Sequence, residues 1–312
     1  MEDPHAQRSM VVVLHPHRAA ARAAALTVCA RLAAEGIEAR MLESDYRALV
    51  EYEDQPEVPI SVIPDSAPNP DSADVELVMV LGGDGTILRA AEHFHGSQVP
   101  IMGINLGHVG FLAESERKDL ELAVRRAADR DYEVEQRMAL DIAVSLGDEV
   151  IHRGWALNEA TIEKSRDCSM IELALGVDAR PVTSFGADGV ILATPTGSTA
   201  YAFSAGGPIV WPEVEALLMV PISAHALFAK PMVVAPDARL GVEFASVQPD
   251  ASAELWCDGR RILDLPRGAR IEAVKSATPV PLARLNMGEF SDRLVAKFHL
   301  PVAGWRGPAV EP

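Results

Sequence analysis

Residues 75–94, VELVMVLGGDGTILRAAEHF, contain an apolar run, a glycine-rich turn and a helical pattern in that order. The run at 75–81 predicts a buried strand, and the pattern at 86–94 predicts a helix. The turn between them consists of Gly82, Gly83, Asp84, Gly85 and Thr86. A turn that leads from a strand into a helix is where α/β sheets bind their ligands. This stretch therefore predicts a strand–turn–helix unit with a ligand site at its turn.

Strand and helix patterns alternate along the rest of the first half of the chain. Strands are expected at 10–15, 37–42 and 99–105, and helices at 19–35 and 118–130. Strands that alternate with helices predict a parallel sheet flanked by helices. From about residue 132 onward helical periodicity is scarce. Short runs bounded by Gly, Pro and Asp there predict a β-rich, sandwich-like domain.

We therefore expect two domains, in keeping with a length of 312 residues. A Rossmann-like α/β domain spans residues 1–132, and a β-rich domain spans 133–285. Residues 286–312 form a tail, helical at 290–300, that returns to complete the first domain. Residues 51–75 are acidic, contain five prolines and show no periodicity, which predicts a long surface loop. In the second domain, strands are expected at 138–146, 150–163, 171–177, 182–185, 190–192, 232–234, 240–244, 254–257 and 270–274.

The composition is that of an acidic globular protein. Apolar residues make up 48% of the chain and charged residues 23%, which argues against disorder. The net charge of −17 disfavours nucleic acid and anionic membranes as partners. The N-terminus does not resemble a signal peptide and no apolar run approaches the roughly 20 residues of a membrane span, so we expect a cytoplasmic protein. Three scattered cysteines, Cys29, Cys168 and Cys257, predict reduced, structural thiols.

The turn at 82–86 has the composition of a phosphate-binding loop. Glycines let the backbone approach a phosphate closely, and the following helix offers free amide groups. The pattern is neither the P-loop GxxxxGK[ST] nor GxGxxG. Its carboxylate, Asp84, would repel a phosphate unless it does chemistry, binds a metal or accepts a sugar hydroxyl. The alternative is a tight turn in which Asp84 caps the helix through Thr86.

Further polar segments lie in the second half of the chain. The run at 193–209, ATPTGSTAYAFSAGGPI, follows an apolar strand and exposes many amides and hydroxyls, which suits a ligand with many oxygens. Asn158 and Glu159 could together bind an adenine edge and a ribose diol, although polar pairs are common at strand ends. The pairs Asp188-Gly189 and Asp258-Gly259 are typical of hairpin turns.

These motifs, in this order and spacing, resemble those of bacterial NAD kinases. The resemblance rests on LGGDGTILR (81–89), NLGHVGFL (105–112), Asn158-Glu159 and DGVILATPTGSTAYAFSAGGP (188–208). CDGR (257–260) and LPVAGWRG (300–307) fit as well, and the last resembles actinobacterial members. Lipid kinases and phosphofructokinases share a GGDGT-like loop, whereas the long TPTGSTAY run is far more specific. The resemblance covers nearly the whole chain.

The resemblance implies ATP-dependent phosphorylation of NAD at the 2′-hydroxyl of its adenosine ribose, giving NADP. Asp84 would be the catalytic carboxylate, acting on the ribose hydroxyls as general base or orienting group. The donor phosphates would lie along Gly82, Gly83, Gly85 and Thr86. Because a P-loop lysine is absent, Mg²⁺ carried by those phosphates, with Arg89, would neutralise their charge, and no metal site made by the protein is expected. Inorganic polyphosphate is an alternative donor.

The resemblance also assigns residues to the dinucleotide. Besides Asp84 and Gly85, the NAD site would include Asn158, Glu159, Thr199, Ala200, Tyr201 and Ser204. Asp188 would reach the nicotinamide end, in this family often across a subunit boundary, which implies a homo-oligomer such as a dimer or tetramer. Arg89 and Arg260 match positions that contact ligand in some members. Ser169 stands where some relatives carry a basic or imidazole group.

Two other functions stay open at this point. One is a lipid or sphingoid kinase of the same superfamily, which would need an apolar acceptor pocket where residues 193–209 are small and polar. The other is a non-catalytic NAD-binding sensor, which would have no need of the Asp84 carboxylate in a phosphate turn. Formation of NADP from NAD, ATP and Mg²⁺ would separate the three functions.

Overall fold

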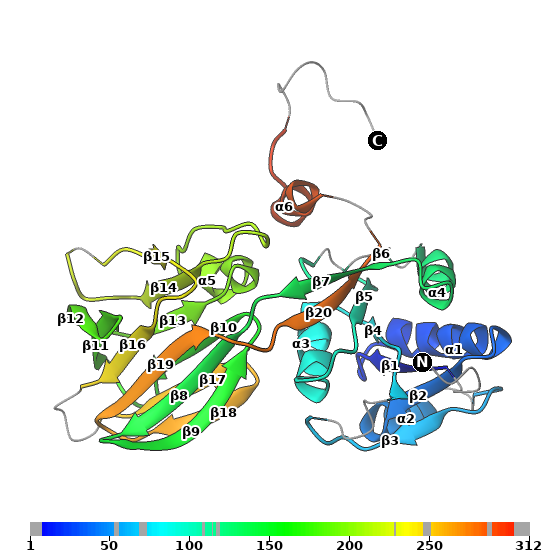
Figure 1. Cartoon of the computed structure of the whole chain (residues 1–312), viewed down its shortest axis with the longest axis horizontal. Helices are drawn as coiled ribbons and strands as arrows, with labels where there is room; N and C mark the ends of the chain where they lie inside the picture. Colours follow the sequence, from blue (N-terminus) through cyan, green and yellow to red (C-terminus); the bar gives the residue numbers. More distant parts are fainter. Residues whose placement is uncertain are drawn as a thin grey trace. The chain divides into compact units, whose positions relative to one another are not determined.

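In the computed structural model the chain forms two compact units (Figure 1). The structure describes residues 8–52, 56–68, 74–107, 110–113, 115–116, 119–227, 229–245, 251–285 and 289–302. The first unit comprises Met1–Gln136 and Val280–Pro312, and the second comprises Arg137–Pro279. The sequence analysis places these divisions after residues 132 and 285.

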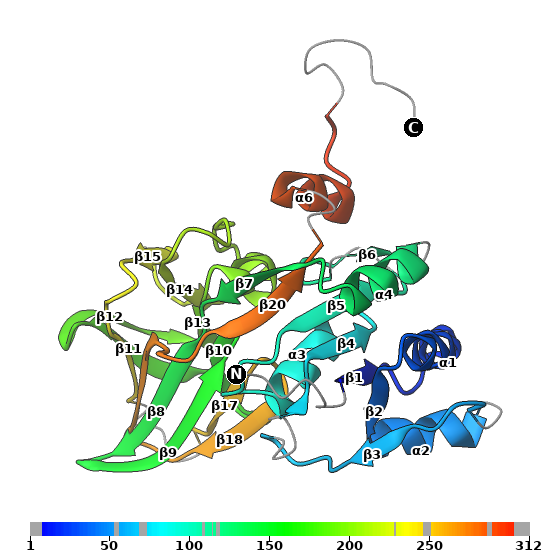
Figure 2. The ribbon, with the colours of Figure 1, turned by 45° about the vertical axis from the view of Figure 1, so that its right-hand side comes forward.

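A largely parallel sheet organises the first unit. Its strands run in the order β3-β2-β1-β4-β5-β20-β7, with β6 beside β5. The strands are β1 (Ser9–Leu14), β2 (Glu38–Leu42), β3 (Ser61–Ile63), β4 (Leu77–Leu81), β5 (Ile101–Asn105), β6 (Ser115–Glu116), β7 (Glu133–Arg137) and β20 (Val280–Arg284). The helices are α1 (Ala19–Ala34), α2 (Glu43–Tyr52), α3 (Asp84–His93), α4 (Leu120–Ala128) and α6 (Phe290–Phe298). Figure 2 shows β7 and β20, far apart in sequence, side by side at one end of this sheet.

The core of the first unit lies around its central strands. β1, β4 and β5 are buried along their whole length, as expected of parallel strands that are covered on both faces. Ala21 and Ala25 of α1 join Ala123 and Ala127 of α4 in one apolar cluster with these strands. Their spacing of four residues places each pair on one face of its helix. The three helices expected in this half of the chain are present as α1, α3 and α4.

Two elements of the first unit differ from the sequence-based expectation. No element was expected at α2, which buries only Asp45 and Leu49. β3 lasts three residues and pairs in parallel with β2, inside the segment expected to be a loop. The expectation of a loop over residues 51–75 is therefore wrong at 51–52 and 61–63, and residues 53–55 and 69–73 of that segment lie outside the described part of the chain.

The second unit consists of two six-stranded sheets, both antiparallel. Sheet B runs β12-β11-β16-β19-β8-β9, and sheet C runs β15-β14-β13-β10-β17-β18. The strands of sheet B are β8 (Leu140–Leu146), β9 (Glu149–Ala156), β11 (Ile171–Val177), β12 (Arg180–Ala187), β16 (Leu240–Phe244) and β19 (Ala269–Lys275). Those of sheet C are β10 (Glu159–Lys164), β13 (Gly189–Ala193), β14 (Leu217–Ile222), β15 (Met232–Val234), β17 (Ala253–Cys257) and β18 (Arg261–Leu265). A 3₁₀ turn (Thr196–Thr199) and α5 (Tyr201–Ser204) follow β13.

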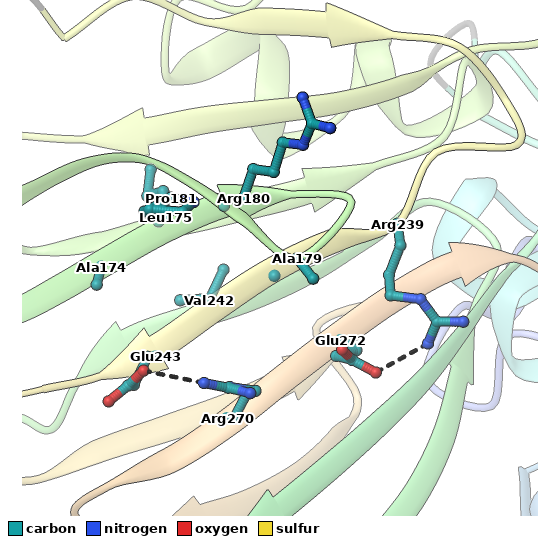
Figure 3. A pocket seen from close by; sticks show the side chains of 12 residues that line it. Ala174, Leu175, Ala179, Arg180, Pro181, Arg239, Val242, Glu243, Arg270 and Glu272 are labelled. Carbon is teal, nitrogen blue, oxygen red and sulfur yellow. Dashed lines mark hydrogen bonds and ion pairs between the residues drawn. The ribbon is translucent and has the colours of Figure 1, made fainter.

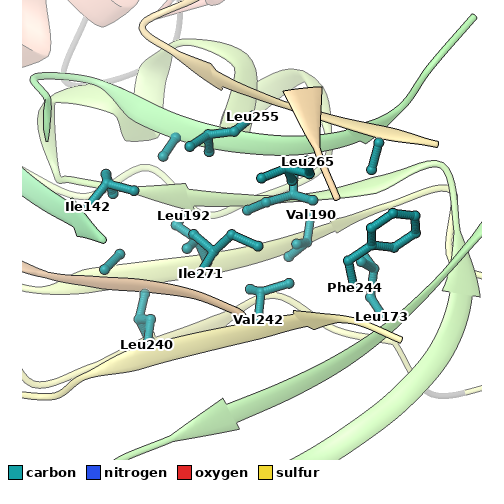
Figure 4. Packing of buried hydrophobic residues seen from close by; sticks show 14 of the residues in the cluster. Ile142, Leu173, Val190, Leu192, Leu240, Val242, Phe244, Leu255, Leu265 and Ile271 are labelled. Atoms are coloured by element: carbon teal, nitrogen blue, oxygen red, sulfur yellow. The ribbon is translucent and has the colours of Figure 1, made fainter. Parts of the chain in front are cut away.

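Alternating side chains build the core of the second unit between its two sheets. β8, β11, β16 and β19 bury every second residue, the pattern of strands with one covered face. Figure 4 shows Val242 and Ile271 of sheet B in one cluster with Val190, Leu192 and Leu255 of sheet C. An α/β domain with a parallel sheet followed by a β-rich, sandwich-like domain is thus confirmed. The single run expected at 150–163 is instead two strands, β9 and β10.

All three cysteines lie in the described part of the chain. Cys29, Cys168 and Cys257 are buried and unpaired. Burial raises the pKa of the Cys29 and Cys257 thiols to about 12, so both stay protonated and unreactive. None of the helices in the described ranges combines the length and apolar character needed to cross a membrane.

Candidate functional site

The glycine turn of the first unit joins β4 to α3. Gly83 caps α3 in an extended conformation, and its carbonyl accepts the amide hydrogens of Thr86 (2.9 Å) and Ile87 (3.2 Å). Gly82 donates to Ile104 O on β5 at 3.0 Å. A Cβ on Gly82 would collide with the side chain of Thr86, so the turn requires a residue without one. Asp84 is thus held as the first residue of the helix.

The carboxylate of Asp84 is fixed by a loop that follows β5. Phe111 N donates to Oδ2 at 3.0 Å and Leu112 N donates to Oδ1 at 3.1 Å. A Cβ on Gly110 would collide with the same carboxylate. Asp84 therefore does not cap its own helix through Thr86, which was the alternative from sequence, because both oxygens bond to this loop. Each oxygen keeps a second lone pair for another hydrogen-bond donor.

The tail helix α6 packs against the loop that holds Asp84. The ring of Phe111 lies 5.8 Å from the rings of both Phe290 and Phe298, measured between centroids. Arg293 Nη1 also donates to Phe111 O at 3.2 Å. The residue that gives its amide to Asp84 is therefore anchored from its other side by α6. His108 of the NLGHVGFL motif and residues 303–307 of LPVAGWRG lie outside the described part of the chain.

Arg89 takes part in a structural ion pair in the first unit. Its Nη2 donates to both carboxylate oxygens of Asp45 at 2.8 Å and to Leu14 O at 2.7 Å. Asp45 is fully buried and also accepts the amide hydrogen of Leu14 at 3.1 Å. Burial raises the pKa of Asp45, and the Arg89 guanidinium opposes that rise. In this structure Arg89 Nη2 is bonded to Asp45. The ligand contact of Arg89 that the resemblance implies stays a prediction.

The second unit places Asn158 and Glu159 where β10 begins. Both residues are 7% exposed, yet Asn158 Oδ1 and Glu159 Oε2 have no hydrogen-bond partner. Burial, together with the neighbouring Asp258 carboxylate, raises the pKa of Glu159 to about 8. Buried polar atoms without partners carry a free-energy cost that a bound ligand can remove. The pair thus offers two acceptor atoms to a ligand.

Asp258, which sequence analysis assigned only to a turn, holds this junction. Asp258 (φ 54°) and Gly259 (φ 63°) both adopt left-handed backbone conformations in the tight turn between β17 and β18. Oδ2 accepts the amide hydrogen of Leu157 at 3.0 Å and Oδ1 accepts that of Asn158 at 2.7 Å. Arg261 Nη2 donates to Oδ2 at 2.7 Å. The side chain of Asp258, only 3% exposed, therefore sets the backbone from which Asn158 projects.

Arg261 closes the network behind this junction. Nη2 of Arg261 also donates to Trp155 O at 3.0 Å, and its guanidinium lies 4.3 Å from the centroid of the Trp155 ring. Trp155 belongs to β9, so the contact ties the strand before the junction to the turn after β17. The sequence offered one signal for this network, an Asp-Gly turn with an arginine three residues after the aspartate. The amides that Asp258 binds, however, lie about a hundred residues earlier in the chain.

The TPTGST run folds directly against the same junction. Thr194 Oγ1 donates to Leu157 O at 2.6 Å, and Thr194 N donates to Asn158 O at 2.9 Å. A Cβ on Gly197 would collide with the backbone of Asn158. The backbone amide of Tyr201 hydrogen-bonds the Glu159 carboxylate. The structure thus brings Asn158 and Glu159 together with the run that contains the predicted residues Thr199, Ala200, Tyr201 and Ser204.

Asp188 and Ser169 lie at the other end of β10, whereas Arg260 lies near its start. Lys164 Nζ forms an ion pair with Asp188 Oδ1 and donates to Ser169 O, both at 3.0 Å. Asp188 connects β12 of sheet B to β13 of sheet C, so Asp188-Gly189 is not a hairpin turn. Arg260 lies in the β17–β18 turn, where its amide donates to Cys257 O at 3.1 Å. The structure therefore brings Asp188 and Ser169 together through Lys164.

A cavity of about 300 Å³ on sheet B contains none of the predicted site residues (Figure 3). Its charged lining is largely paired, since Arg239 Nη1 lies 2.9 Å from Glu272 Oε2 and Arg270 Nη2 lies 3.5 Å from Glu243 Oε2. Arg180 is the remaining charged residue of the lining. The Asp84 turn of the first unit and the Asn158–Glu159 junction of the second unit are therefore two separate candidate sites.

The matching family profiles and two similar relatives agree on one family. The profile of the ATP-NAD kinase N-terminal domain matches residues 10–132, and that of the ATP-NAD kinase C-terminal domain matches residues 157–285. The NAD kinase of Leifsonia xyli is 54% identical over 303 residues, which are 97% of this chain and 98% of that protein. NAD kinase 2 of Streptomyces coelicolor is 53% identical, covering 96% of this chain and 97% of its own.

Two solved structures are similar to this one. The first is yeast NADH kinase complexed with NADH, with a TM-score of 0.83 and 22% identity, covering 97% of this chain and 94% of its own. The second is an NAD kinase from Archaeoglobus fulgidus in complex with ATP, with a TM-score of 0.68 and 26% identity, covering 94% of this chain and 100% of its own. The first, at that identity, supports the fold alone.

Proposed function

This chain belongs to the ATP-NAD kinase family, and we propose that it transfers the terminal phosphate of ATP to the 2′-hydroxyl of the adenosine ribose of NAD, giving NADP. The observation that carries the proposal is the Asp84 carboxylate, which two backbone amides hold in a glycine turn at the start of α3. A lipid-type kinase is not favoured because the acceptor run at 193–209 is small and polar. A sensor without turnover is not favoured because it would need no carboxylate in this turn.

Asp84 acts as the base or orienting group for the acceptor hydroxyl. The ribose hydroxyl donates its hydrogen to a free lone pair of the carboxylate, which turns a hydroxyl lone pair toward the phosphorus atom. As the new O–P bond forms and the donor's bridging bond breaks, the proton passes to Asp84. The amides of Phe111 and Leu112 keep the carboxylate in one orientation throughout. General base catalysis of this kind contributes about 10²–10⁴-fold in rate.

Asn158 and Glu159 bind the adenosine half of the acceptor. The unpartnered Oδ1 of Asn158 suits an exocyclic amino group, and the unpartnered Oε2 of Glu159 suits a ribose hydroxyl. Thr199, Ala200, Tyr201 and Ser204 lie in the run that folds against this pair, and they complete the pocket. Asp258 keeps the pair in place without touching the ligand.

The donor phosphates lie along the loop of Gly82, Gly83, Gly85 and Thr86, in which the amides of Gly82 and Thr86 already donate to Ile104 O and Gly83 O. Among the residues that the structure describes, no group of three or more His, Cys, Asp or Glu side chains is arranged to hold a metal ion. We expect Mg²⁺ to arrive with the donor, because it usually binds through one or two carboxylates together with substrate phosphates. When bound, Mg²⁺ would neutralise part of the negative charge of the donor. Inorganic polyphosphate is an alternative donor for the same loop.

Asp188 and Ser169 extend the proposal to the assembly of the protein. Lys164 holds the Asp188 carboxylate at the end of β10, and Asp188 reaches the nicotinamide end of a dinucleotide held by a neighbouring subunit. The protein is then a homo-oligomer, a dimer or a tetramer, that works in the cytoplasm. Sedimentation at assay concentration tests this part, and a monomer with full activity would contradict it.

A coupled assay tests the proposed function. The purified chain is incubated with NAD, Mg²⁺ and either ATP or polyphosphate, and NADP is detected with an NADP-specific dehydrogenase. We expect NADP to accumulate with ATP. NAD binding without any product would favour the sensor, and phosphorylation of a sphingoid base without NADP would favour the lipid-type kinase.

A further inference from the structure

The sheet of the first unit changes direction between β1 and β4. From β1 the chain passes through α1 to β2 on one side, and from β4 it passes through α3 to β5 on the other, while β1 and β4 pair directly in parallel. Ligands of α/β sheets bind outside the carboxyl ends of the strands at such a switch point. Figure 1 shows β1 and β4 as neighbours in the middle of this sheet. The glycine turn at 82–86 occupies one flank of the switch, and residues 15–18, HPHR, occupy the other.

Arg18 spans the carboxyl end of β4. It precedes α1 directly, and a Cβ built on Gly107, in the loop after β5, would lie 3.3 Å from Arg18 Nη1. Because β4 lies between β1 and β5 in the sheet, a side chain that starts after β1 and ends beside Gly107 crosses the end of β4. The turn from Gly82 to Asp84 begins at that end. The guanidinium therefore lies across the edge where the donor turn starts.

Arg18 differs in its partners from the other arginine expected at this site. Its side chain is exposed and makes no hydrogen bond or ion pair with any residue in the described ranges, whereas Arg89 Nη2 is bonded to Asp45 and Leu14. Beside Arg18, His15 Nδ1 is buried without a hydrogen-bond partner. Burial and the Arg18 charge lower the pKa of His15, which keeps its ring neutral. A free guanidinium and an unpaired ring nitrogen thus occur together at the switch point.

We infer that Arg18 binds the phosphate chain of the donor across the glycine turn, an inference that rests on the proposed kinase function. The planar guanidinium fork suits a phosphate, to which it can donate two hydrogen bonds. The need for a local cation is large because the chain carries a net charge of −17 and the turn lacks a P-loop lysine. Arg18 thereby takes the charge-neutralising role that sequence analysis gave to Arg89.

Steady-state kinetics of Arg18→Gln and Arg18→Lys test the inference. We expect R18Q to raise the KM for ATP at least about tenfold and leave the KM for NAD within about twofold, since charge-assisted hydrogen bonds to phosphate are the strong ones. R18K should recover part of the loss because it keeps the charge without the fork. Arg31→Gln is the matched control, because Arg31 lies in the last turn of α1, the helix that Arg18 precedes, is 57% exposed and forms a surface ion pair with Glu121.

Inhibition by inorganic tripolyphosphate separates contact with phosphate from contact with adenosine. Tripolyphosphate is tested as a competitive inhibitor against ATP. If Arg18 binds the phosphate chain, the inhibition constant of tripolyphosphate rises in R18Q by about the same factor as the KM for ATP. An unchanged KM for ATP in an R18Q protein that still unfolds at the wild-type temperature overturns the inference while leaving the kinase function intact. Absence of NADP from the wild-type protein overturns the kinase function instead. Calorimetric titration of both proteins with MgATP then still tests Arg18, and equal affinities overturn the inference.

Discussion

Asp84 and Asp258 are two aspartates that the two units of this chain hold by the same device. Each follows a strand, stands beside glycine, and accepts backbone amide hydrogens from consecutive residues of a distant segment. They differ in what else reaches the carboxylate. Asp258 is closed off by Arg261 at 2.7 Å and its side chain is 3% exposed, whereas Asp84 is only partly buried.

The difference between the two aspartates shows how one arrangement serves two purposes. Paired amides orient a carboxylate in either setting. Where lone pairs remain open, as at Asp84, the oriented group can receive a proton from a substrate. Where a guanidinium takes them, as at Asp258, the group can only position its neighbours. The comparison therefore predicts loss of turnover at one aspartate and loss of binding at the other.

Asp84→Asn should have the largest effect of any variant. The amide keeps the size of the side chain but is a poor proton acceptor, so kcat should fall at least about 100-fold. The affinity for NAD, measured by calorimetry, should stay within about threefold. Asp141→Asn, on an exposed position of β8, is the control and should behave as wild type. Near-normal turnover in D84N would remove Asp84 from the chemistry.

Gly110→Ala should act on the same carboxylate through space. The added Cβ would collide with the Asp84 carboxylate and turn it away from its amide partners. We expect kcat to fall about 10- to 100-fold, the cost of a small misplacement of a reacting group, with little change in the KM for NAD. Gly241→Ala, where an added Cβ meets nothing closer than 3.8 Å, is the control. A kcat within twofold of wild type would show that the loop tolerates the methyl group.

Asp258→Asn should weaken NAD binding and stability more than turnover. The variant leaves Arg261 without its ion-pair partner and loosens the backbone of Asn158, so the KM for NAD should rise about tenfold. The free energy of unfolding, measured in urea, should fall by about 3 kcal/mol. This is the low end for breaking a buried ion pair, because the Arg261 side chain keeps some contact with solvent. Asp264→Asn, exposed on the neighbouring strand, is the control. A lower kcat with an unchanged KM would reverse the roles of the two aspartates.

Glu159 should make the stability of the ligand-free protein depend on pH. Its pKa of about 8 lies above the value near 4.5 of an unfolded chain, so the folded protein holds a proton that the unfolded chain has released. The stabilisation is complete below about pH 4.5 and is lost as the pH rises through about 8. Glu159→Gln lacks this dependence, so its stability relative to wild type should grow by a few kcal/mol, at order of magnitude, between pH 5 and pH 8.5. The free energy of unfolding of both proteins is measured by urea denaturation at several pH values in this range. A constant difference between the two proteins would refute the pKa shift.

The sequence predicts the parts of this molecule that depend on neighbouring residues. The strand, glycine turn and helix around Asp84 lie within 20 residues, and the alternating patterns of the second unit are equally local. The network at Asp258 could not be found in this way, because its amide partners lie about a hundred positions earlier in the chain. Gly110 is similar, since its reason to be glycine is the carboxylate of Asp84. α2 was missed because one of its two buried residues is the charged Asp45.

A double-variant cycle between Asp84 and Gly110 tests most directly whether an oriented carboxylate carries out the reaction. The kcat for NADP formation is measured for wild type, D84N, G110A and the double variant at saturating NAD and ATP. If Gly110 matters only because it leaves room for the Asp84 carboxylate, the double variant turns over no more slowly than D84N alone. A further tenfold loss in the double variant, on top of D84N, would mean that the loop acts independently of Asp84 and would contradict the account.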